Sequence, residues 1–193
     1  MSDIVPAKTA LLLMDFQNMI VAMLGEGGPA LLDRAVKARA AAKAAGLAVM
    51  HVRVAFTEAD YAAIPSRNKG FSALAAAGRM LSDGSEAAAI HPALAPAADE
   101  EVFRKVRVGA FSTTNLAERL AARGIDTLVL AGIATSGVVL STLRDAADRD
   151  FRLFVLADVC ADMDGEVYRV LSEKVFPRQA EVIALDDFVR VAR

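Results

Sequence analysis

The sequence has few of the residues on which disulfide-linked or metal-rich proteins depend. Only one cysteine, Cys160, occurs among the 193 residues, so no disulfide can form within the chain. The two histidines, His51 and His91, are too few for a histidine-rich metal centre, and we expect neither a metal nor any other cofactor. His51 lies in an apolar stretch and is expected to be a hydrogen-bonded core residue. Cys160 is expected to be a small buried residue.

An excess of positive charge and long apolar runs are also missing. Lys and Arg number 22 against 24 Asp and Glu, which gives a formal charge of -2 and leaves nothing to neutralise a phosphate backbone. We therefore expect no nucleic-acid partner. The apolar run that starts at Ala10 stops at Asp15, far short of the roughly 20 residues of a membrane span, and no basic segment typical of a signal peptide precedes it. The expected location is the cytoplasm, without a membrane partner.

Apolar residues, by contrast, are abundant. They make up 55% of the 20.4 kDa chain, which is ample for one buried core. We find no internal repeat and no linker, so residues 1–193 are expected to form a single domain. The alanine-rich helical stretches also favour a homo-oligomer, either a dimer or a tetramer.

Short apolar runs rich in β-forming residues alternate with longer helical stretches. Six strands are predicted, at 9–14, 47–54, 101–106, 126–130, 151–156 and 181–184. Helices are predicted at 29–45, 113–123, 137–148 and 165–175, with another inside 71–81. This alternation predicts an α/β fold with a mainly parallel, doubly wound, six-stranded sheet. The irregular segment 55–100 is expected to cover the ligand crevice or an oligomer interface.

In such a sheet, ligands bind beyond the carboxyl ends of the strands, where the strand order reverses. Asp15 ends the first predicted strand in the stretch LLLMDFQN. Its neighbours Met14 and Phe16 should partly desolvate the carboxylate and raise its pKa, which suits a general acid or base. Alternatively, Asp15 caps a turn or the next helix.

Lys105 ends the third predicted strand and is followed by Arg107. An ammonium beside a carboxylate favours the charged form of both groups, so Lys105 is a candidate partner for Asp15. Alternatively, Arg104, Lys105 and Arg107 form a solvated strand end.

After the fourth strand the chain runs through Gly132 into small residues and then a helix, in the sequence LVLAGIATSGVVLSTL. An elbow of this kind points backbone N–H groups into the crevice, where they can hold an oxyanion or a substrate carboxylate. Alternatively, Thr135 and Ser136 are ordinary helix N-caps.

These motifs, in this order, resemble the isochorismatase-like, or cysteine hydrolase, superfamily over nearly the whole chain. They are DFQN, a mid-chain K-x-R-x-x-A-F formed by Lys105, Arg107, Ala110 and Phe111, and G-I-A-T-S-G-V-V followed by STLRDAADRD. The resemblance implies a three-layer α/β/α domain that hydrolyses a small organic molecule, with nicotinamidases and other amide hydrolases among the relatives. Metal-binding nicotinamidases carry an Asp/His cluster after the second strand, and this sequence lacks it.

The resemblance also implies a catalytic trio of Asp, Lys and Cys. Asp15 and Lys105 match the first two, as general acid/base and electrostatic partner, but the third position holds Val138. A valine cannot form the thiolate that attacks a carbonyl carbon. Isochorismatases have glycine at this position and cleave a vinyl ether, a reaction that needs an acid and water but no covalent nucleophile. Because valine is bulkier than glycine, isochorismate is not assigned as the substrate.

By the same resemblance, the Ile133–Ala134 peptide bond is expected to be cis, with the N–H groups of Ala134 and Val138 forming an anion pocket. Substrate contacts are expected from Phe16, Arg107, Phe111, Ile133, Ala134 and Thr135. The alternative to a hydrolase is a catalytically silent ligand-binding or oligomeric scaffold protein that kept the fold. The presence of Asp15 and Lys105 favours the enzyme, and Val138 favours the scaffold.

Overall fold

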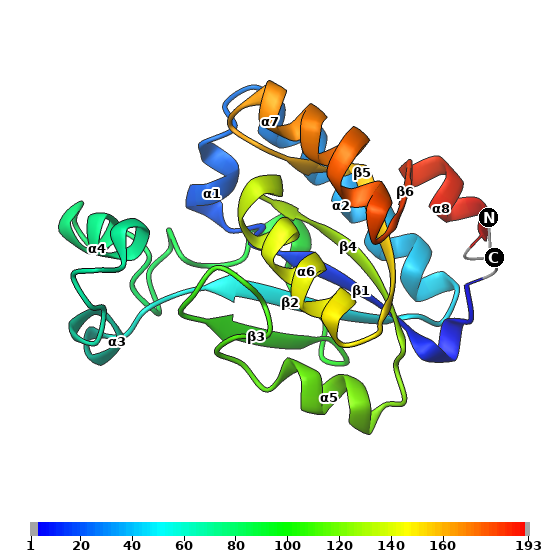
Figure 1. The fold of residues 1–193 in the computed structure, drawn as a ribbon, viewed down its shortest axis with the longest axis horizontal. Coiled ribbons are helices and arrows are strands. Elements are labelled where there is room, and N and C mark those ends of the chain that lie inside the picture. The colour runs from blue at the N-terminus through cyan, green and yellow to red at the C-terminus, as the bar shows by residue number, and fades with distance from the viewer. Residues whose placement is uncertain (1–3, 192–193) are drawn as a thin grey trace.

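The computed structural model describes residues 4–191, which form a six-stranded sheet in the order β3-β2-β1-β4-β5-β6. Every neighbouring pair of strands is parallel, and helices flank the sheet (Figure 1). The strands are β1 (Thr9–Met14), β2 (Ala48–Val54), β3 (Glu101–Lys105), β4 (Thr127–Ile133), β5 (Arg152–Ala161) and β6 (Glu181–Ile183). The predicted doubly wound α/β sheet is therefore confirmed, with its strand order reversing between β1 and β4.

Helices cover both faces of the sheet. On one face lie α2 (Gly27–Ala44) and α8 (Leu185–Val191), and on the other α5 (Leu116–Ala122), α6 (Leu140–Asp148) and α7 (Gly165–Val170). Successive residues of β1 alternate between the two cores: Leu11 and Leu13 pack under α2, whereas Leu12 packs under α6. All six residues of β1 are buried, as expected for a central parallel strand covered on both faces.

Segment 55–100 carries short helices of its own, α3 (Glu58–Ala62) and α4 (Lys69–Ala76), which extend away from the sheet (Figure 1). The helix expected inside 71–81 is α4, shifted towards the N-terminus. Neither α3 nor α1 (Asn18–Ala22) nor α8 was predicted, because each spans only one or two turns and shows little periodicity. A signal for α3 was nevertheless present: Thr57 and Asp60 form a reciprocal capping box.

Strand β5 continues to Ala161, five residues beyond its predicted end. The prediction ended at Leu156, ahead of the polar Asp158, but the β4–β5 register shifts between Leu130 and Gly132, which accommodates an irregular stretch. There the Asp158 carboxylate accepts a hydrogen bond from the backbone N–H of Leu185 (2.8 Å). A polar residue thus joins β5 to α8 without ending the strand.

Across residues 4–191, no helix combines the length and the apolar character that crossing a bilayer requires.

Candidate active site

Strands β1 and β4 approach each other closely at the point where the strand order reverses. Met14 is paired with Gly132, and a Cβ atom placed on Gly132 would lie only 2.7 Å from the Met14 carbonyl oxygen. Asp15 follows β1 directly, and the elbow follows β4. The structure therefore places Asp15 and the elbow at adjacent carboxyl strand ends, as the sequence pattern predicts.

Asp15 is a buried carboxylate on a constrained backbone. Its residue is 4% exposed, and its φ of 60° lies in the left-handed region that favours glycine. One oxygen, Oδ2, accepts a hydrogen bond from Lys105, whereas Oδ1 has no hydrogen-bond partner among residues 4–191. Burial raises the pKa of the Asp15 carboxyl, and the Lys105 ammonium only partly offsets this effect. A raised pKa makes a carboxyl hold its proton more readily than an exposed carboxyl does, which suits a general acid or base.

Lys105 comes from the edge strand β3 and reaches past the end of β2 to Asp15. Its Nζ lies 2.8 Å from Oδ2 of Asp15 and 3.3 Å from the carbonyl oxygen of Arg107. The residue is 1% exposed, so the two charges are paired away from solvent. Buried charges of this kind require close partners, which explains the direct contact. The alternative in which Lys105 belongs to a solvated strand end is wrong.

The elbow contains the cis peptide bond that the resemblance implied. The Ile133–Ala134 peptide bond is cis, and residues Thr135–Val139 form a π-helical turn that leads into α6. Val138 is 2% exposed and packs in the core beneath α6. The only cysteine in the sequence is elsewhere, so the elbow presents no thiol. The hydroxyl of the fully buried Thr135 has no hydrogen-bond partner within residues 4–191.

The three other expected substrate contacts differ in where they lie. Arg107 is half-buried; its guanidinium donates to the Val106 carbonyl (2.6 Å) and stacks 5.6 Å from the centre of the Phe71 ring of α4. Phe16 is buried in the core on the α2 side.

Phe111 is not beside Asp15. Its ring packs 6.1 Å from that of Phe151 and 5.0 Å from the guanidinium of Arg149. Both neighbours follow the far end of α6, whereas the elbow precedes its first residue. The expectation that Phe111 contacts substrate near the elbow therefore receives no support from its position.

Gln17, within the DFQN motif, organises the site in a way that the sequence analysis missed. Its amide donates to the carbonyls of Val54 (2.9 Å) and Ala88 (2.7 Å) and accepts from the N–H of Val54 (2.8 Å). It thereby ties the ends of β1 and β2 to segment 55–100. That segment also pairs with Gln17 at Ile90, so part of it covers the carboxyl ends of the strands, as expected.

Asp162 is the second residue that sequence analysis missed. It directly follows β5, and its Oδ2 accepts a hydrogen bond from the backbone N–H of Ser136 (2.7 Å). One N–H group of the elbow is therefore held by a carboxylate of the protein itself. Ser136 donates its N–H across strands instead of acting as a side-chain N-cap.

Cys160 and His51 have the structural surroundings that were expected of them. Cys160 is 5% exposed in the core under α6 and α7, and burial raises the pKa of its thiol to about 12. His51 is 1% exposed, and its Nε2 lies 2.8 Å from Oε2 of Glu100. Burial lowers the pKa of His51, against the influence of Glu100, which favours a neutral ring. No cluster of three or more His, Cys, Asp or Glu side chains suited to a metal ion occurs in residues 4–191.

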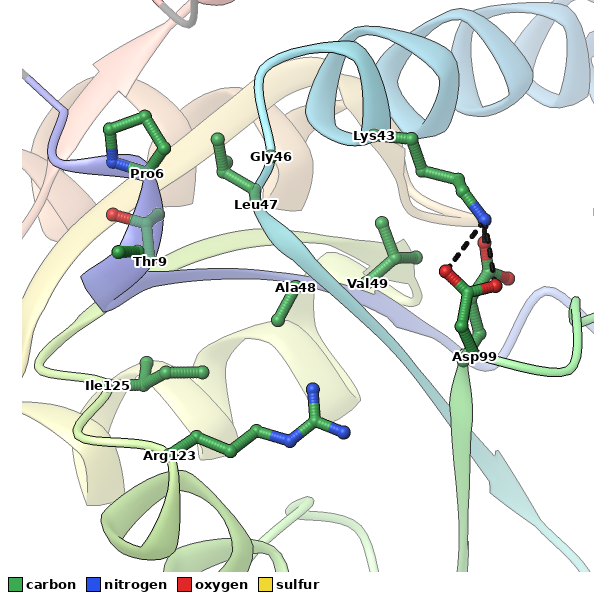
Figure 2. A pocket seen from close by; sticks show the side chains of 12 residues that line it. Pro6, Thr9, Lys43, Gly46, Leu47, Ala48, Val49, Asp99, Arg123 and Ile125 are labelled. Carbon is green, nitrogen blue, oxygen red and sulfur yellow. Dashed lines mark hydrogen bonds and ion pairs between the residues drawn. The ribbon is translucent and has the colours of Figure 1, made fainter.

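A pocket of about 750 Å³ opens at the other end of the strands, near the amino ends of β1 and β2 (Figure 2). Arg123 extends into it from one side and Lys43 from the other. Lys43 bonds to Asp99 (3.0 Å), and Arg123 lies 2.5 Å from Glu101. Because Lys43, Asp99 and Arg123 are already held in ion pairs, none of them is free to act on a bound molecule.

Comparisons with known proteins agree with this architecture. Residues 9–187 match the model of the isochorismatase domain family. The chain is 33% identical over 186 residues to the isochorismatase family protein YecD of Escherichia coli O157:H7, covering 94% of each protein. It is 27% identical over 190 residues to the maleamate amidohydrolase of Pseudomonas putida, covering 96% of this chain and 87% of that enzyme. The solved structure of an isochorismatase family protein from Desulfovibrio vulgaris superposes with a TM-score of 0.83 at 26% identity, covering 96% of this chain and 99% of that one. The chain therefore belongs to the isochorismatase family.

Proposed function

We propose that this isochorismatase-family hydrolase cleaves a small organic molecule by acid–base catalysis at Asp15, without a covalent cysteine intermediate. Lys105 is the electrostatic partner of Asp15. The N–H groups of Ala134 and Val138 form the pocket for the developing oxyanion. Arg107 is the proposed anchor for a polar group of the substrate, because the residue is half-buried, its carbonyl oxygen accepts a hydrogen bond from Lys105, and its guanidinium lies beside the apolar ring of Phe71.

The observation that carries this proposal is the buried Asp15–Lys105 ion pair at the point where the strand order reverses. A buried ion pair is weak evidence for stability, because the cost of desolvating both charges can exceed their mutual attraction. A pair of this kind, with a raised carboxyl pKa and a free carboxylate oxygen, is instead typical of a catalytic site.

A carboxamide is the substrate class that we favour. The maleamate amidohydrolase matches nearly the whole chain, and hydrolysis of an amide needs the groups gathered here. A base must take a proton from the attacking group, N–H donors must hold the oxyanion, and an acid must protonate the leaving nitrogen. Asp15 can act first as base and then as acid.

The test is a substrate panel of maleamate, other primary amides, nitriles and vinyl ethers, with ammonia release as the readout for the amides and nitriles. We expect amide turnover that falls by roughly 10²- to 10⁴-fold in Asp15→Asn, the range lost with a general base. The matched control is Asp126→Asn. Asp126 forms an ion pair with Lys8 at the amino ends of the strands, away from the proposed site, so this substitution should leave turnover unchanged. Turnover of no compound would instead favour a silent ligand-binding or oligomeric scaffold protein, for which the valine at position 138 is the supporting observation.

A further inference from the structure

Two buried oxygen atoms at the carboxyl ends of β1 and β4 lack hydrogen-bond partners within residues 4–191. They are Oδ1 of Asp15 and Oγ1 of Thr135, in residues that are 4% and 0% exposed. Buried polar atoms in folded proteins are nearly always hydrogen-bonded, so each unpaired one calls for a physical explanation. A carboxylate oxygen is an acceptor and a threonine hydroxyl is both donor and acceptor, so the two are complementary to one small polar guest.

The topology keeps these two residues close together. Asp15 lies one residue beyond the Met14–Gly132 rung, and Thr135 lies three residues beyond that rung along the chain, as the first residue of the elbow turn that follows β4. Because neighbouring strands are only about 4.8 Å apart, both residues are held at the same end of two adjacent strands. A water molecule can bridge two oxygen atoms that lie about 5 Å apart, so a bridge between Oδ1 and Oγ1 requires a separation of about that length.

We propose that Thr135 is a positioning residue that holds the attacking water molecule against Oδ1 of Asp15. This inference rests on the proposed function and adds the identity of the nucleophile and of the side chain that orients it. The water donates one hydrogen bond to Oδ1, and its oxygen accepts a hydrogen bond from the Thr135 hydroxyl. Its remaining lone pair is then free to face the substrate carbonyl.

The other hydroxyl and thiol groups near the elbow do not replace a water nucleophile. Cys160 lies in the core, where its thiol pKa of about 12 keeps it protonated at neutral pH. Ser136 is exposed, and its backbone is tied to Asp162 on the side facing β5. Lys105 directs its ammonium at Oδ2 of Asp15, so it neutralises the carboxylate and is not a nucleophile itself.

The proposed hydrolysis of the amide consumes one water molecule and regenerates the Asp15 carboxylate. The water oxygen forms a bond to the amide carbonyl carbon while one water proton moves to Oδ1 of Asp15, giving a tetrahedral oxyanion. Collapse of this species breaks the C–N bond, and the same proton passes from Asp15 to the leaving nitrogen. The products are a carboxylic acid and an amine, or ammonia from a primary amide. No oxidant or cofactor is required.

The first measurement does not depend on a substrate. Crystal structures of the wild type, Thr135→Ser and Thr135→Val should show a water molecule within hydrogen-bond distance of both Oδ1 of Asp15 and the hydroxyl at position 135 in the first two proteins. In Thr135→Val, which keeps the side-chain shape but removes the hydroxyl, that water should be lost or displaced. Crystals in which the Thr135 hydroxyl donates to a backbone carbonyl instead, with no such water, overturn the inference.

The second measurement is steady-state kinetics on the amide found with the panel. We expect Thr135→Val to lower kcat by about 10- to 100-fold with KM changed less than about threefold, and Thr135→Ser to retain most of kcat. Thr9→Val is the control for a general loss of stability. It removes a buried hydroxyl that donates a hydrogen bond to the Val5 carbonyl at the amino end of β1, away from the proposed site. An unchanged kcat in Thr135→Val overturns this inference and leaves the hydrolase proposal intact, whereas the absence of any turnover overturns both.

Discussion

Lys105 donates its hydrogen bond to Asp15 from the edge of the sheet, across the end of the intervening strand β2. Ninety residues separate the two in the sequence, yet both side chains are almost completely buried. Each charge is the main compensation for burying the other. Removing either one therefore leaves an unpaired charge in the interior, and the two substitutions should not be additive.

The first prediction concerns this pair. Lys105→Met should lower the free energy of unfolding by about 3 to 5 kcal/mol, because it leaves the Asp15 carboxylate buried without its counter-ion. The double variant Asp15→Asn, Lys105→Met should be more stable than the sum of the single changes predicts, since neither charge then remains. Urea denaturation of the four proteins at pH 7 measures the coupling. Additive effects would show that the two groups do not depend on each other.

The second prediction concerns the close approach of β1 and β4. In Gly132→Ala the new methyl group would lie 2.7 Å from the Met14 carbonyl oxygen and 2.9 Å from its Cβ, so the strands must separate. Overpacking of this kind costs about 1 to 3 kcal/mol. Gly137→Ala is the matched control within the elbow, because its nearest contacts would be ordinary ones at 3.9 Å. Equal stability of the two variants would contradict the tight packing at Gly132.

The third prediction concerns the buried cluster around Glu100. Burial alone would raise the pKa of this carboxyl, but hydrogen bonds from Arg39, His51, the Ala97 N–H and Lys43 outweigh it and lower the pKa from 4.5 to about 2. A carboxyl whose pKa is lowered by folding stabilises the protein above its unfolded pKa, and this contribution disappears as the pH falls towards the folded value. The difference of about 2.5 pKa units corresponds to about 3 kcal/mol.

Glu100→Gln tests that contribution. We expect the wild type to lose about 3 kcal/mol relative to this variant as the pH is lowered from 5 to 2, measured by urea denaturation at each pH. Glu26→Gln, at an exposed position before α2, is the control for a general effect of losing one carboxylate. A stability difference between wild type and Glu100→Gln that does not change with pH would rule out the lowered pKa.

Much of the framework could be predicted from the sequence, because strands and helices leave local periodic patterns. The runs that form β1 and β2 are separated by a long alanine-rich helical stretch, and the rules for parallel sheets then place Asp15 at a crevice. The pairing of Lys105 with Asp15 was predicted from the order of the motifs and their family resemblance, and the reach of Lys105 across β2 became known only from the strand order. The position of Phe111 did not follow, because its place in a motif says nothing of the side on which its ring packs.

Contacts made by irregular segments were beyond sequence analysis. Gln17 bonds to Ala88, 71 residues away, in a stretch without hydrophobic periodicity. Asp162 holds the elbow from the end of a strand that was expected to end at Leu156. Such contacts depend on tertiary geometry, and a single sequence carries no pattern that specifies them.

The last prediction uses the missing thiol as a probe. In the proposed site geometry, Val138→Cys places a thiol near the Lys105 ammonium and the backbone N–H groups of the elbow, both of which stabilise a thiolate, while burial opposes ionisation. The replacement is slightly smaller than valine and should cost no more than roughly 1 to 2 kcal/mol, so the fold should survive. Cys160 is a buried thiol in the same protein whose pKa is raised to about 12, and it serves as the internal control. We expect the introduced thiol to react with iodoacetamide with an apparent pKa below the free-thiol value of about 8.5. Cys160 should stay unreacted until the protein unfolds. Modification of Cys160 should therefore cause no loss of activity.

Two further variants identify the cause of that reactivity. Adding Lys105→Ala to Val138→Cys should raise the apparent pKa of the introduced thiol, because the nearby positive charge is lost. Adding Asp162→Asn should lower it, because the carboxylate bound to the Ser136 N–H then no longer repels a thiolate at the elbow. Peptide mapping of the labelled protein assigns each rate to its cysteine. If the introduced thiol titrates near 8.5 or above and neither substitution moves it, Val138 does not face the Asp15–Lys105 pair and the proposed site geometry is wrong.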